Sequence, residues 1–399
     1  MLSESAEGSE VRARLGVITN DFPPKLGGIQ SYFLSLFESL GPEEVIVVAP
    51  RVEGCERFDR RCPFEVVRIA TPPEALLPTP KTAKLVAGLL KSRGVDIVGL
   101  TSMVPLIPLG VRTATLCDSP LVVWHHGAEI ASLARIPFSR IALGKYGRKV
   151  DVHFVVSNWT GSVARQAFGE GADIRLMRFG VDADRFHPVS SDDEKMRKRS
   201  EIGVANGDAD PLLLSVGRLV KRKGNDVLVS VVTLMKSRHP KCSLVIAGRG
   251  PDRQRLEKLV AQSPVSEKIQ FLGAVDGDML PDLYRCADIF VAPIRSRFFG
   301  IEGEGLGITL VEAAASGLPV VAGRSGGTPE AVLDGISGFV VDGADPYEVV
   351  AAIARIVVDK DLRRAMGTKG REFVQSEFSR SKMAHVFRAA ARDVLDRTG

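Results

Sequence analysis

Residues 289–315 read IFVAPIRSRFFGIEGEGLGITLVEAAA, and this stretch contains the structural unit that recurs along the chain. A short apolar run at 289–292 is followed by a glycine-rich loop and then by a helical pattern that starts near Gly307. Short β-branched runs, turns marked by glycine or proline, and amphipathic stretches indicate β-strands that alternate with α-helices. Such alternation predicts parallel sheets covered by helices on both faces.

The same unit recurs on both sides of this stretch. The strands that we predict in the first half are 15–19, 45–49, 65–69, 96–100, 121–124, 153–157 and 174–177, with helices that include 30–40, 82–92 and 159–168. The strands that we predict in the second half are 211–216, 243–247, 269–272, 289–292, 320–321 and 338–341. The two halves resemble each other in pattern rather than in sequence.

The length of 399 residues exceeds what one hydrophobic core usually supports, so we expect two domains. A polar, highly charged stretch at 190–210 indicates a linker with one short helix. We therefore predict an α/β protein with two doubly wound, Rossmann-like domains that face each other across a cleft. The boundaries are 1–200 for the first domain and 201–378 for the second, with a C-terminal helix at 379–399 that packs back on the first domain.

Composition limits the classes of function. The 53 Lys and Arg against 48 Asp and Glu give a net charge of +5, which suits an anionic ligand or membrane but is too small to indicate a nucleic-acid-binding protein. Five scattered cysteines without C-x-x-C spacing indicate neither a zinc site nor a disulfide framework. The polar start, MLSESAEGSE, is unlike a signal peptide, and no apolar run reaches the roughly 18 residues that span a bilayer. We expect a cytoplasmic protein without a metal site.

Two glutamates flank the start of the helix that follows Gly307. Glu304 precedes this helix and Glu312 lies in its second turn, about 12 Å away if the stretch is fully helical. This spacing suits one ligand held at two points, such as a sugar and a ribose, because carboxylates accept hydrogen bonds from hydroxyl groups. The alternative is that Glu304 only complements the helix dipole and that Glu312 is solvated. The apolar neighbours of Glu312 argue against solvation, since a buried carboxylate needs a partner.

The second candidate site directly follows the strand at 211–216. Arg218 leaves the strand tip, and Lys223 precedes the next helix. Two cations at the carboxyl edge of a parallel sheet can hold a diphosphate and neutralise charge on a leaving group. A basic surface loop is the alternative, and we assign Lys221 and Arg222 to it.

Two segments of the first half also follow strands. Asp21 precedes the turn Gly27-Gly28 ahead of a predicted helix that contains Gln30; this turn suits either close approach to a phosphate or sugar, or helix capping. His126 precedes a glycine at a strand tip, where it contacts a ligand or satisfies a loop carbonyl. At Gly248–Pro251 a plain turn is as good an interpretation as contact with a base. Ser325–Glu330 resembles a capped helix start, although its glycines also suit a position that lines the cleft. His153, His187, His239 and His385 have no ligand spacing.

Taken together, these segments resemble the retaining GT-B glycosyltransferases of the large glycogen-synthase-like family. The Gly27-Gly28 turn, the His126-Gly127 strand tip, the Arg218-x4-Lys223 pair and the Glu304-x7-Glu312 motif appear in that family's order over nearly the whole chain. The likeness is closer to the actinobacterial mannosyltransferases that use GDP-mannose and phosphatidylinositol monomannoside. The residues that carry it are 19–24, 27–32, 304–308 and 325–327. The chain has His126-Gly127-Ala128-Glu129 where that subfamily usually has His-Gly-His-Glu. Residues 296–303 match only part of the subfamily's usual sequence.

The resemblance implies a site and a reaction. It implies that the first domain binds the acceptor, through Asp21, Gly27, Gly28 and Gln30, and that the second binds the nucleotide-sugar. The residues implied in catalysis are His126, Arg218, Lys223 and Glu304, and those implied in donor binding are Gly28, Arg218, Lys223, Gly250, Val275, Glu304, Gly305, Leu306, Gly307 and Glu312. GDP-mannose is the implied donor and no cofactor is required, with stimulation by Mg²⁺ left open. The implied acceptor is a phosphatidylinositol mannoside lipid at the inner face of the plasma membrane.

Other interpretations remain at this stage. The basic amphipathic stretch 133–150 suits either peripheral contact with anionic lipid or packing against the core. The donor base and sugar, the acceptor, and the oligomeric state are open. A sugar-nucleotide epimerase shares the two-domain shape, but no dedicated acid/base set is evident. A dehydrogenase lacks its G-x-G-x-x-G fingerprint, and a non-catalytic binding module is the remaining class.

Overall fold

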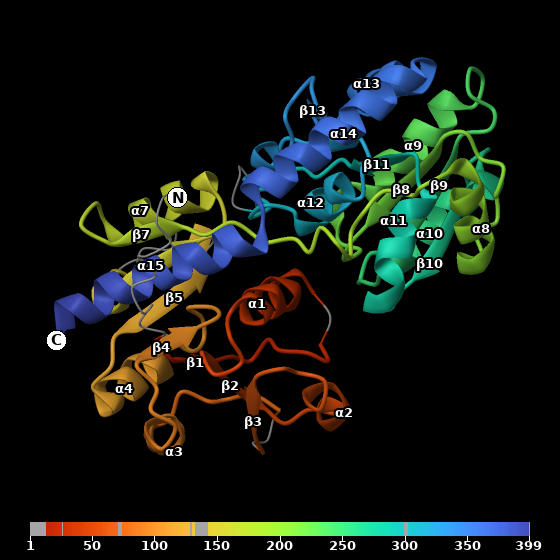
Figure 1. Ribbon diagram of the computed structural model, residues 1–399. Coiled ribbons are helices and arrows are strands. Elements are labelled where there is room, and N and C mark those ends of the chain that lie inside the picture. Colours follow the sequence, from red (N-terminus) through yellow and green to blue (C-terminus); the bar gives the residue numbers. More distant parts are fainter. Residues whose placement is uncertain are drawn as a thin grey trace, which may run out of the picture. The chain divides into compact units, whose positions relative to one another are not determined.

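The computed structural model describes residues 13–25, 27–70, 74–127, 130–131, 143–298 and 302–398. The chain forms two compact units. The first comprises residues 1–155, 161–177 and 381–399, and the second comprises residues 156–160 and 178–380. Figure 1 labels helices and strands of both units.

The first unit contains a sheet of seven parallel strands in the order β3-β2-β1-β4-β5-β6-β7. These strands are β1 (Leu15–Ile18), β2 (Val45–Pro50), β3 (Glu65–Ile69), β4 (Ile97–Leu100), β5 (Leu121–His125), β6 (Val152–Val155) and β7 (Ile174–Leu176). The helices are α1 (Gly28–Ser39), α2 (Cys55–Asp59), α3 (Pro80–Lys91), α4 (Ile107–Cys117), α7 (Asn158–Phe168) and α15 (Arg380–Thr398), of which α7 and α15 begin in the second unit.

Apolar side chains cover both faces of the first sheet. On one face, α3, α4 and α7 contribute residues such as Val86, Leu109 and Ala164 to a core with the strands. On the other face, Phe33 of α1 packs edge-on against Trp124 of β5, with ring centroids 5.4 Å apart. Aromatic contacts of this kind add to the stability that burial of apolar area provides.

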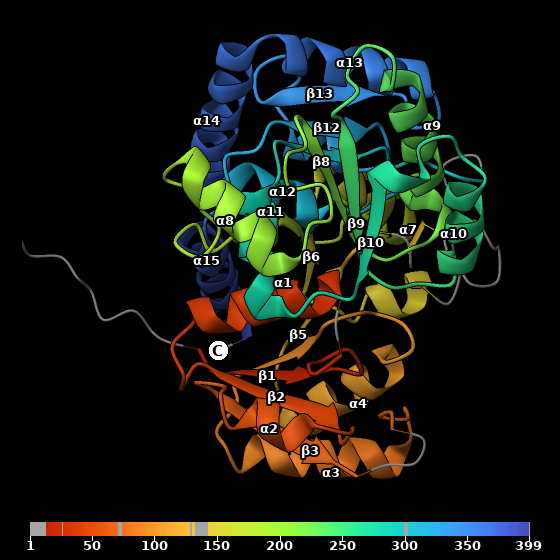
Figure 2. The same ribbon diagram turned by 90° about the vertical axis from the view of Figure 1, so that its right-hand side faces the viewer.

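The second unit contains a sheet of six parallel strands in the order β10-β9-β8-β11-β12-β13. These strands are β8 (Leu212–Val216), β9 (Ser243–Ala247), β10 (Ile269–Gly273), β11 (Ile289–Ala292), β12 (Val320–Gly323) and β13 (Gly338–Val341). The helices are α8 (Asp192–Ile202), α9 (Asn225–Met235), α10 (Arg253–Ala261), α11 (Leu280–Cys286), α12 (Ile308–Ala315), α13 (Pro346–Val358) and α14 (Lys360–Glu377). Short 3-10 turns are η1 (Lys221–Lys223), η2 (Ser266–Lys268), η3 (Gly277–Met279) and η4 (Thr328–Ala331) (Figure 2).

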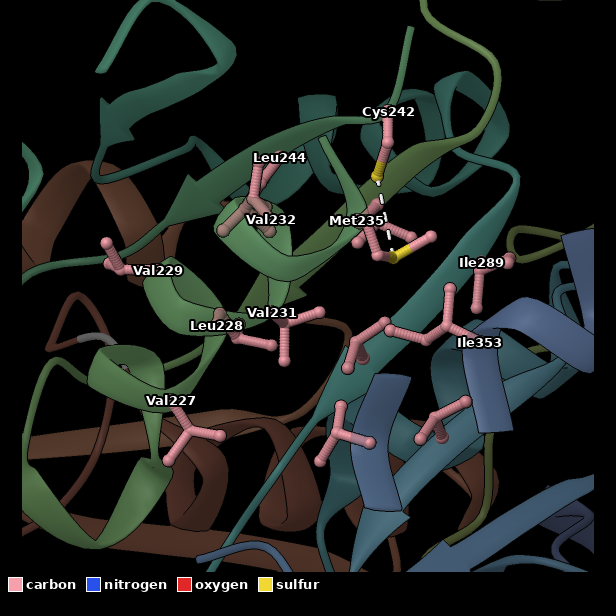
Figure 3. Close-up of a cluster of buried hydrophobic side chains, with 14 of the residues drawn as sticks. Val227, Leu228, Val229, Val231, Val232, Met235, Cys242, Leu244, Ile289 and Ile353 are labelled. Atoms are coloured by element: carbon pink, nitrogen blue, oxygen red, sulfur yellow. Dashed lines mark hydrogen bonds between the residues drawn. The ribbon is translucent and has the colours of Figure 1, made fainter. Parts of the chain in front are cut away.

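The core of the second unit lies between its sheet and two helices that pack together, α9 and α13. Figure 3 shows apolar side chains of α9 gathered with Leu244, Ile289 and Ile353, and a contact from Cys242 Sγ to Met235 Sδ at 3.9 Å. On the opposite face of the sheet, Tyr284 of α11 packs against Phe290 of β11, with ring centroids 5.7 Å apart. Burial on both faces explains why the central strands of this sheet consist mainly of apolar residues.

Both sheets reverse their winding direction once, and this feature positions the site. The chain winds outward from β1 to β3 and then returns to pair β4 with β1; in the second sheet, β11 likewise returns to pair with β8. Ligands of doubly wound sheets bind at the carboxyl ends of strands beside such a reversal. The predicted α/β class, the doubly wound sheets and all thirteen predicted strands are confirmed.

The division of the chain differs from the boundary that we placed at residue 200. Helix α8 groups with the second unit because Arg199 is buried there: its Nη2 donates to Asp288 Oδ2 at 2.8 Å and its Nε to the carbonyl of Cys286 at 2.8 Å. Asp288 also accepts from the amide of Leu212. The continuous part of the second unit begins at Arg178. The polar stretch 190–210, which we interpreted as a linker, therefore belongs to the fold of the second unit.

Candidate functional site

Lys223 and Glu304 meet at the carboxyl edge of the second sheet. Lys223 follows β8 and Glu304 follows β11, and these two strands are neighbours where the winding reverses. Lys223 Nζ lies 3.0 Å from Glu304 Oε2, and the two side chains are 14% and 15% exposed. Two sequence-predicted residues that are 81 positions apart are therefore in direct contact.

Arg222 is the residue of this site that the sequence analysis missed. We assigned it to a solvated basic loop, but its Nη1 forms an ion pair with Glu304 Oε2, and its side chain is 27% exposed. The η1 turn directs both Arg222 and Lys223 toward the same carboxylate. Burial acts to raise the pKa of Glu304, but Lys223 and Arg222 outweigh this effect and the net shift is downward. Glu304 is therefore an ionised acceptor held between two cations.

The loop of Glu304 is held by the segment that follows β12. The amide of Gly327 donates to the carbonyl of Glu304 at 2.9 Å, and the amide of Glu304 lies 3.4 Å from Ser325 Oγ. Gly326 has a φ of 58°, and a Cβ there would lie 2.2 Å from the carbonyl oxygen of Glu304. A side chain at this position would push the loop away, so glycine is required. We interpreted 325–330 as a capped helix start whose glycines also suit the lining of a cleft; in the structure its glycines contact the backbone of Glu304.

Glu312 is buried on α12. It is 5% exposed, and its Oε2 accepts a hydrogen bond from the hydroxyl of Tyr284 at 2.8 Å. The alternative of a solvated glutamate is wrong. Burial raises the pKa of Glu312 from 4.5 to about 7, against the opposing effects of the hydrogen bond from Tyr284 and the charge of Arg185. Sequence analysis named no partner for this carboxylate, because Tyr284 lies on a different helix, 28 positions away.

The pKa of Glu312 predicts a specific dependence of stability on pH. Because the folded pKa lies above the unfolded value, the folded state binds this proton more tightly. Stability from this group is therefore complete below about pH 4.5, falls as the pH rises to about 7, and then stays lower by on the order of 3 kcal/mol. We expect Glu312→Gln to gain stability relative to the natural chain at about pH 8 but not at about pH 4.5. Urea-unfolding midpoints of both proteins measure this difference, and a difference that does not change with pH would contradict the assignment.

Helix α12 begins at the same edge of the sheet. Its N-cap is Gly307, with a φ of 91°, and no side chain caps it and no acid lies in its first turn. Leu306 before it is buried and Gly305 is half-buried. Free amides at a helix start attract phosphate groups. Gly305, Leu306 and Gly307 thus connect Glu304 to the start of α12.

Arg218 and Gly250 lie in two adjoining loops after β8 and β9. Arg218 is exposed, and its side chain makes no hydrogen bond or ion pair with any residue that the structure describes. The two loops pack backbone to backbone: the amide of Leu219 donates to the carbonyl of Arg249, and a Cβ at Gly250 would lie 2.2 Å from the carbonyl oxygen of Leu219. Val275 is half-buried in the loop after β10. Arg218 and Val275 follow the carboxyl ends of their strands, but no contact joins either side chain to Glu304.

The predicted residues of the first unit lie at the corresponding edge of its sheet. His126 Nε2 is 3.0 Å from the carbonyl oxygen of Thr101, which follows β4, and its ring packs edge-on against Tyr32 and Phe33 of α1. Thr101 Oγ1 in turn donates to Thr19 Oγ1 at 2.7 Å. His126 thus satisfies a loop carbonyl, as one of our two alternatives predicted, at the winding reversal of this sheet. Residue 128, where the chain departs from the family motif, lies outside the described residues, as does residue 129.

The turn after β1 is open. Gly27 and Gly28 are exposed at the start of α1, and Gln30 folds back so that its Oε1 would lie 2.5 Å from a Cβ at Gly27. Asp21 is half-buried, and its amide donates to Thr19 Oγ1 at 2.9 Å. A side chain at Gly27 would meet only the tip of the flexible Gln30 side chain, which can move aside, so packing alone does not require glycine there.

His153 has a structural position instead of a site. Its Nδ1 lies 2.9 Å from His125 Nε2, both rings are fully buried, and its ring stacks on Phe168 with centroids 4.3 Å apart. Burial lowers the pKa of both histidines, to about 4 for His153, so the pair is neutral near pH 7. This agrees with our interpretation that His153 has no ligand spacing.

Comparison with known proteins identifies the family. The model of "Glycosyl transferases group 1" matches residues 197–373, and that of "Glycosyltransferase Family 4" matches residues 26–185. The GDP-mannose-dependent alpha-(1-6)-phosphatidylinositol monomannoside mannosyltransferase of Mycolicibacterium smegmatis is 36% identical over 359 residues, which are 90% of this chain and 92% of the relative. This chain belongs to the group 1 glycosyltransferases of GT-B fold. The GDP-mannose-dependent monoacylated alpha-(1-6)-phosphatidylinositol monomannoside mannosyltransferase of Corynebacterium glutamicum is 35% identical over 91% of this chain and 93% of its own length.

Solved structures agree with this glycosyltransferase fold. The Anabaena protein HepE, solved with UDP and glucose, matches with a TM-score of 0.80 at 17% identity, over 95% of this chain and 99% of its own. Sucrose-phosphate synthase from Thermosynechococcus elongatus matches with a TM-score of 0.78 at 21% identity, over 97% and 100%. At these identities the likeness shows the fold alone. In this glycosyltransferase, the contact of Lys223 with Glu304 joins an ammonium group and a carboxylate at the edge of the sheet where such folds bind ligands.

Proposed function

We propose that this glycosyltransferase transfers mannose from GDP-mannose, with retention of configuration, to a phosphatidylinositol mannoside. The names of the relatives above, which cover 90% or more of this chain, support this donor and acceptor. The observation that carries the proposal is the contact of Lys223 and Arg222 with Glu304, because it gathers charge for a diphosphate beside a carboxylate for sugar hydroxyls. Burial of Glu312 at the same helix supports a second hydroxyl contact, to the ribose.

The roles follow from the chemistry of each side chain. Lys223 and Arg218 bind the diphosphate and neutralise the charge that develops on it, assisted by the free amides at the start of α12. Glu304 accepts hydrogen bonds from hydroxyls of the mannose, and Glu312 from those of the ribose. In the first unit, His126 positions the transferred sugar, and the turn at Asp21, Gly27, Gly28 and Gln30 contacts the acceptor.

The reaction breaks the bond between the anomeric carbon and the phosphate oxygen and forms a bond to an acceptor hydroxyl oxygen on the same face. The transition state has oxocarbenium character. The departing phosphate takes the electron pair of the broken bond and accepts the proton of the acceptor hydroxyl. Glu304 and Glu312 hold hydroxyls in this scheme, so no side-chain carboxylate acts as a general acid or base.

The donor assignment is tested by thermal unfolding with GDP, UDP and ADP, followed by incubation with their radiolabelled sugars and a phosphatidylinositol mannoside. We expect GDP to stabilise the protein most, and label from GDP-mannose to enter the lipid only when the acceptor is present. Conversion of the nucleotide-sugar without acceptor would instead identify an epimerase. Stabilisation by UDP or ADP above that by GDP would contradict the donor.

We also propose that α3 and α4 of the first unit contact an anionic membrane, where a lipid acceptor would lie. Residues 75–95 and 97–117 contain no Asp or Glu but contain five cations, Lys81, Lys84, Lys91, Arg93 and Arg112. On the same two helices Leu85 and Leu116 are 50% and 41% exposed. Cations beside exposed apolar side chains suit anionic lipid. Within the described residues, no helix combines the length and apolarity needed to cross a bilayer. The stretch 133–150, for which we left either lipid contact or packing against the core open, lies largely outside the described residues.

Charge reversal on α3 tests this surface. We expect Lys84→Glu/Lys91→Glu to weaken binding to phosphatidylserine-containing vesicles by about 30-fold or more, since each cation near such a surface contributes about 1 kcal/mol. Co-sedimentation measures the binding. Arg57→Glu/Arg60→Glu on α2, two exposed cations with the same charge change, is the matched control. Equal losses in both variants, or equal binding to neutral vesicles, would reject the surface.

A further inference from the structure

A second concentration of positive charge lies at the amino edge of the second sheet. A cavity of about 170 Å³ is lined there by Ala287 and Asp288, which precede β11, and by Leu318 and Pro319, which precede β12. Since all strands of this sheet are parallel, the amino ends lie at the edge opposite to Lys223 and Glu304. The cavity is therefore separate from the proposed donor site.

The lining carries five cations and two carboxylates, an excess of three positive charges in a chain whose total excess is five. These seven residues are Lys195, Arg285, Lys360, Arg363, Arg364, Asp192 and Asp288. Two of the cations form short ion pairs: Lys195 binds Asp288 at 2.9 Å, and Arg285 binds Asp282 at 2.6 Å. The other three cations come from the first turns of α14, where Arg363 and Arg364 form only longer ion pairs, at 3.5 and 3.8 Å.

The three cations on α14 are arranged unfavourably for the free protein. Lys360, Arg363 and Arg364 are spaced i, i+3 and i+4, so they share one face of the helix and repel each other. They also lie at the helix N-terminus, where the helix dipole disfavours positive charge. Asp361 offsets part of this charge, with an oxygen 3.8 Å from Arg364, whose side chain is 76% exposed. An anion in the cavity would complement both the cations and the dipole.

One donor of this cluster is buried without a hydrogen bond. Arg363 Nη1 makes none to any residue that the structure describes, although Asp210 Oδ1 lies 3.5 Å away. A buried guanidinium nitrogen without a hydrogen bond costs free energy, and an anionic oxygen is its strongest acceptor. Lys360 is exposed and forms no ion pair with the described residues. The cavity therefore offers three cationic side chains to a ligand without breaking a hydrogen bond within the described residues.

We propose that this cavity binds the phosphate group of a phosphoester ligand, at a site distinct from that of the donor. A free phosphate, a soluble phosphoester and a lipid headgroup share this chemistry. The proposal does not rest on the identity of the donor or of the acceptor.

Binding of inorganic phosphate to the full chain, with GDP present at saturation, tests the site by isothermal titration. We expect Lys360→Glu/Arg364→Glu to weaken phosphate binding by about tenfold or more, because charge-assisted contacts are lost and the charge of the cavity is reversed. Both residues are exposed, so the fold is retained, which circular dichroism checks. Arg238→Glu/Lys258→Glu, two exposed cations of the same unit with the same charge change, should bind phosphate within twofold of the natural chain.

A second arm uses vesicles of phosphatidylcholine with phosphatidic acid, in the Lys84→Glu/Lys91→Glu background. Binding of free phosphate that depends on Lys360 and Arg364 supports a soluble ligand, whereas dependence in the vesicle arm alone supports a lipid headgroup. Equal losses in the control variant, or no binding in either arm, would overturn the proposal.

Discussion

Replacing Lys223 by alanine should lower turnover by about 10²-fold or more, the loss seen when a donor that stabilises charge in the transition state is removed. The reason is the position of Lys223 at the carboxyl edge of the second sheet, with its side chain 14% exposed and its ammonium group 3.0 Å from Glu304. A cation at this position can pass from Glu304 to a diphosphate oxygen with a small movement of its side chain. Arg218→Ala should have an effect of the same order, because its side chain is exposed in the adjoining part of this loop.

Lys221 provides the matched control for Lys223. It lies two residues away in the same basic turn and is exposed. Lys221→Ala should therefore keep turnover near that of the natural chain, with mannose transfer to a phosphatidylinositol mannoside as the assay. Near-normal turnover in Lys223→Ala and Arg218→Ala would refute their assigned roles. An equal loss of turnover in Lys221→Ala would show that the total charge of the loop, rather than the position of Lys223, causes the effect.

Replacing Glu304 by glutamine should separate the affinity for GDP-mannose from that for GDP. The carboxylate is paired with Arg222 and Lys223 on one oxygen, and its other oxygen is available to hydroxyls. Loss of a hydrogen bond to a charged acceptor costs about 1.5–3 kcal/mol, so kcat/KM should fall by about 10- to 150-fold. GDP carries no mannose, and the two cations are freed for its diphosphate, so GDP should bind equally well or more tightly.

Glu302 serves as the control for Glu304. It lies in the same loop, is 39% exposed and is paired with Arg297 at 3.2 Å. Glu302→Gln should leave both affinities within about twofold, since a half-exposed ion pair contributes little. Calorimetric titration with GDP and GDP-mannose measures the separation. If Glu304→Gln weakens both ligands in equal proportion, the role of Glu304 is to hold the loop rather than to bind sugar.

The fold and part of the site follow from local sequence patterns. The central strands, such as β8 and β11, are short runs of mainly apolar residues that the sheet buries, so the pattern and the structure agree. The meeting of Lys223 and Glu304 could be anticipated because each directly follows a strand of a parallel sheet. Their pairing needs only that β8 and β11 be neighbours, as a doubly wound sheet makes them.

Other features depend on contacts that no local pattern encodes. Arg222 and Lys221 are adjacent cations, and only the η1 turn determines that Arg222 faces Glu304 while Lys221 faces solvent. Helix α8 is polar around its circumference, which is typical of a linker, yet its single buried residue, Arg199, fixes it to the second unit. Tyr284 lies on α11 and Glu312 on α12, so no local sequence pattern predicts their hydrogen bond.

A crystal structure of the protein with GDP-mannose tests the central claim most directly. We predict a diphosphate oxygen within hydrogen-bonding distance of Lys223 Nζ and a mannose hydroxyl on the carboxylate of Glu304, so that the donor takes up both members of the present ion pair. A donor bound elsewhere, with Lys223 and Arg222 still paired with Glu304, would show that these residues do not form the donor site.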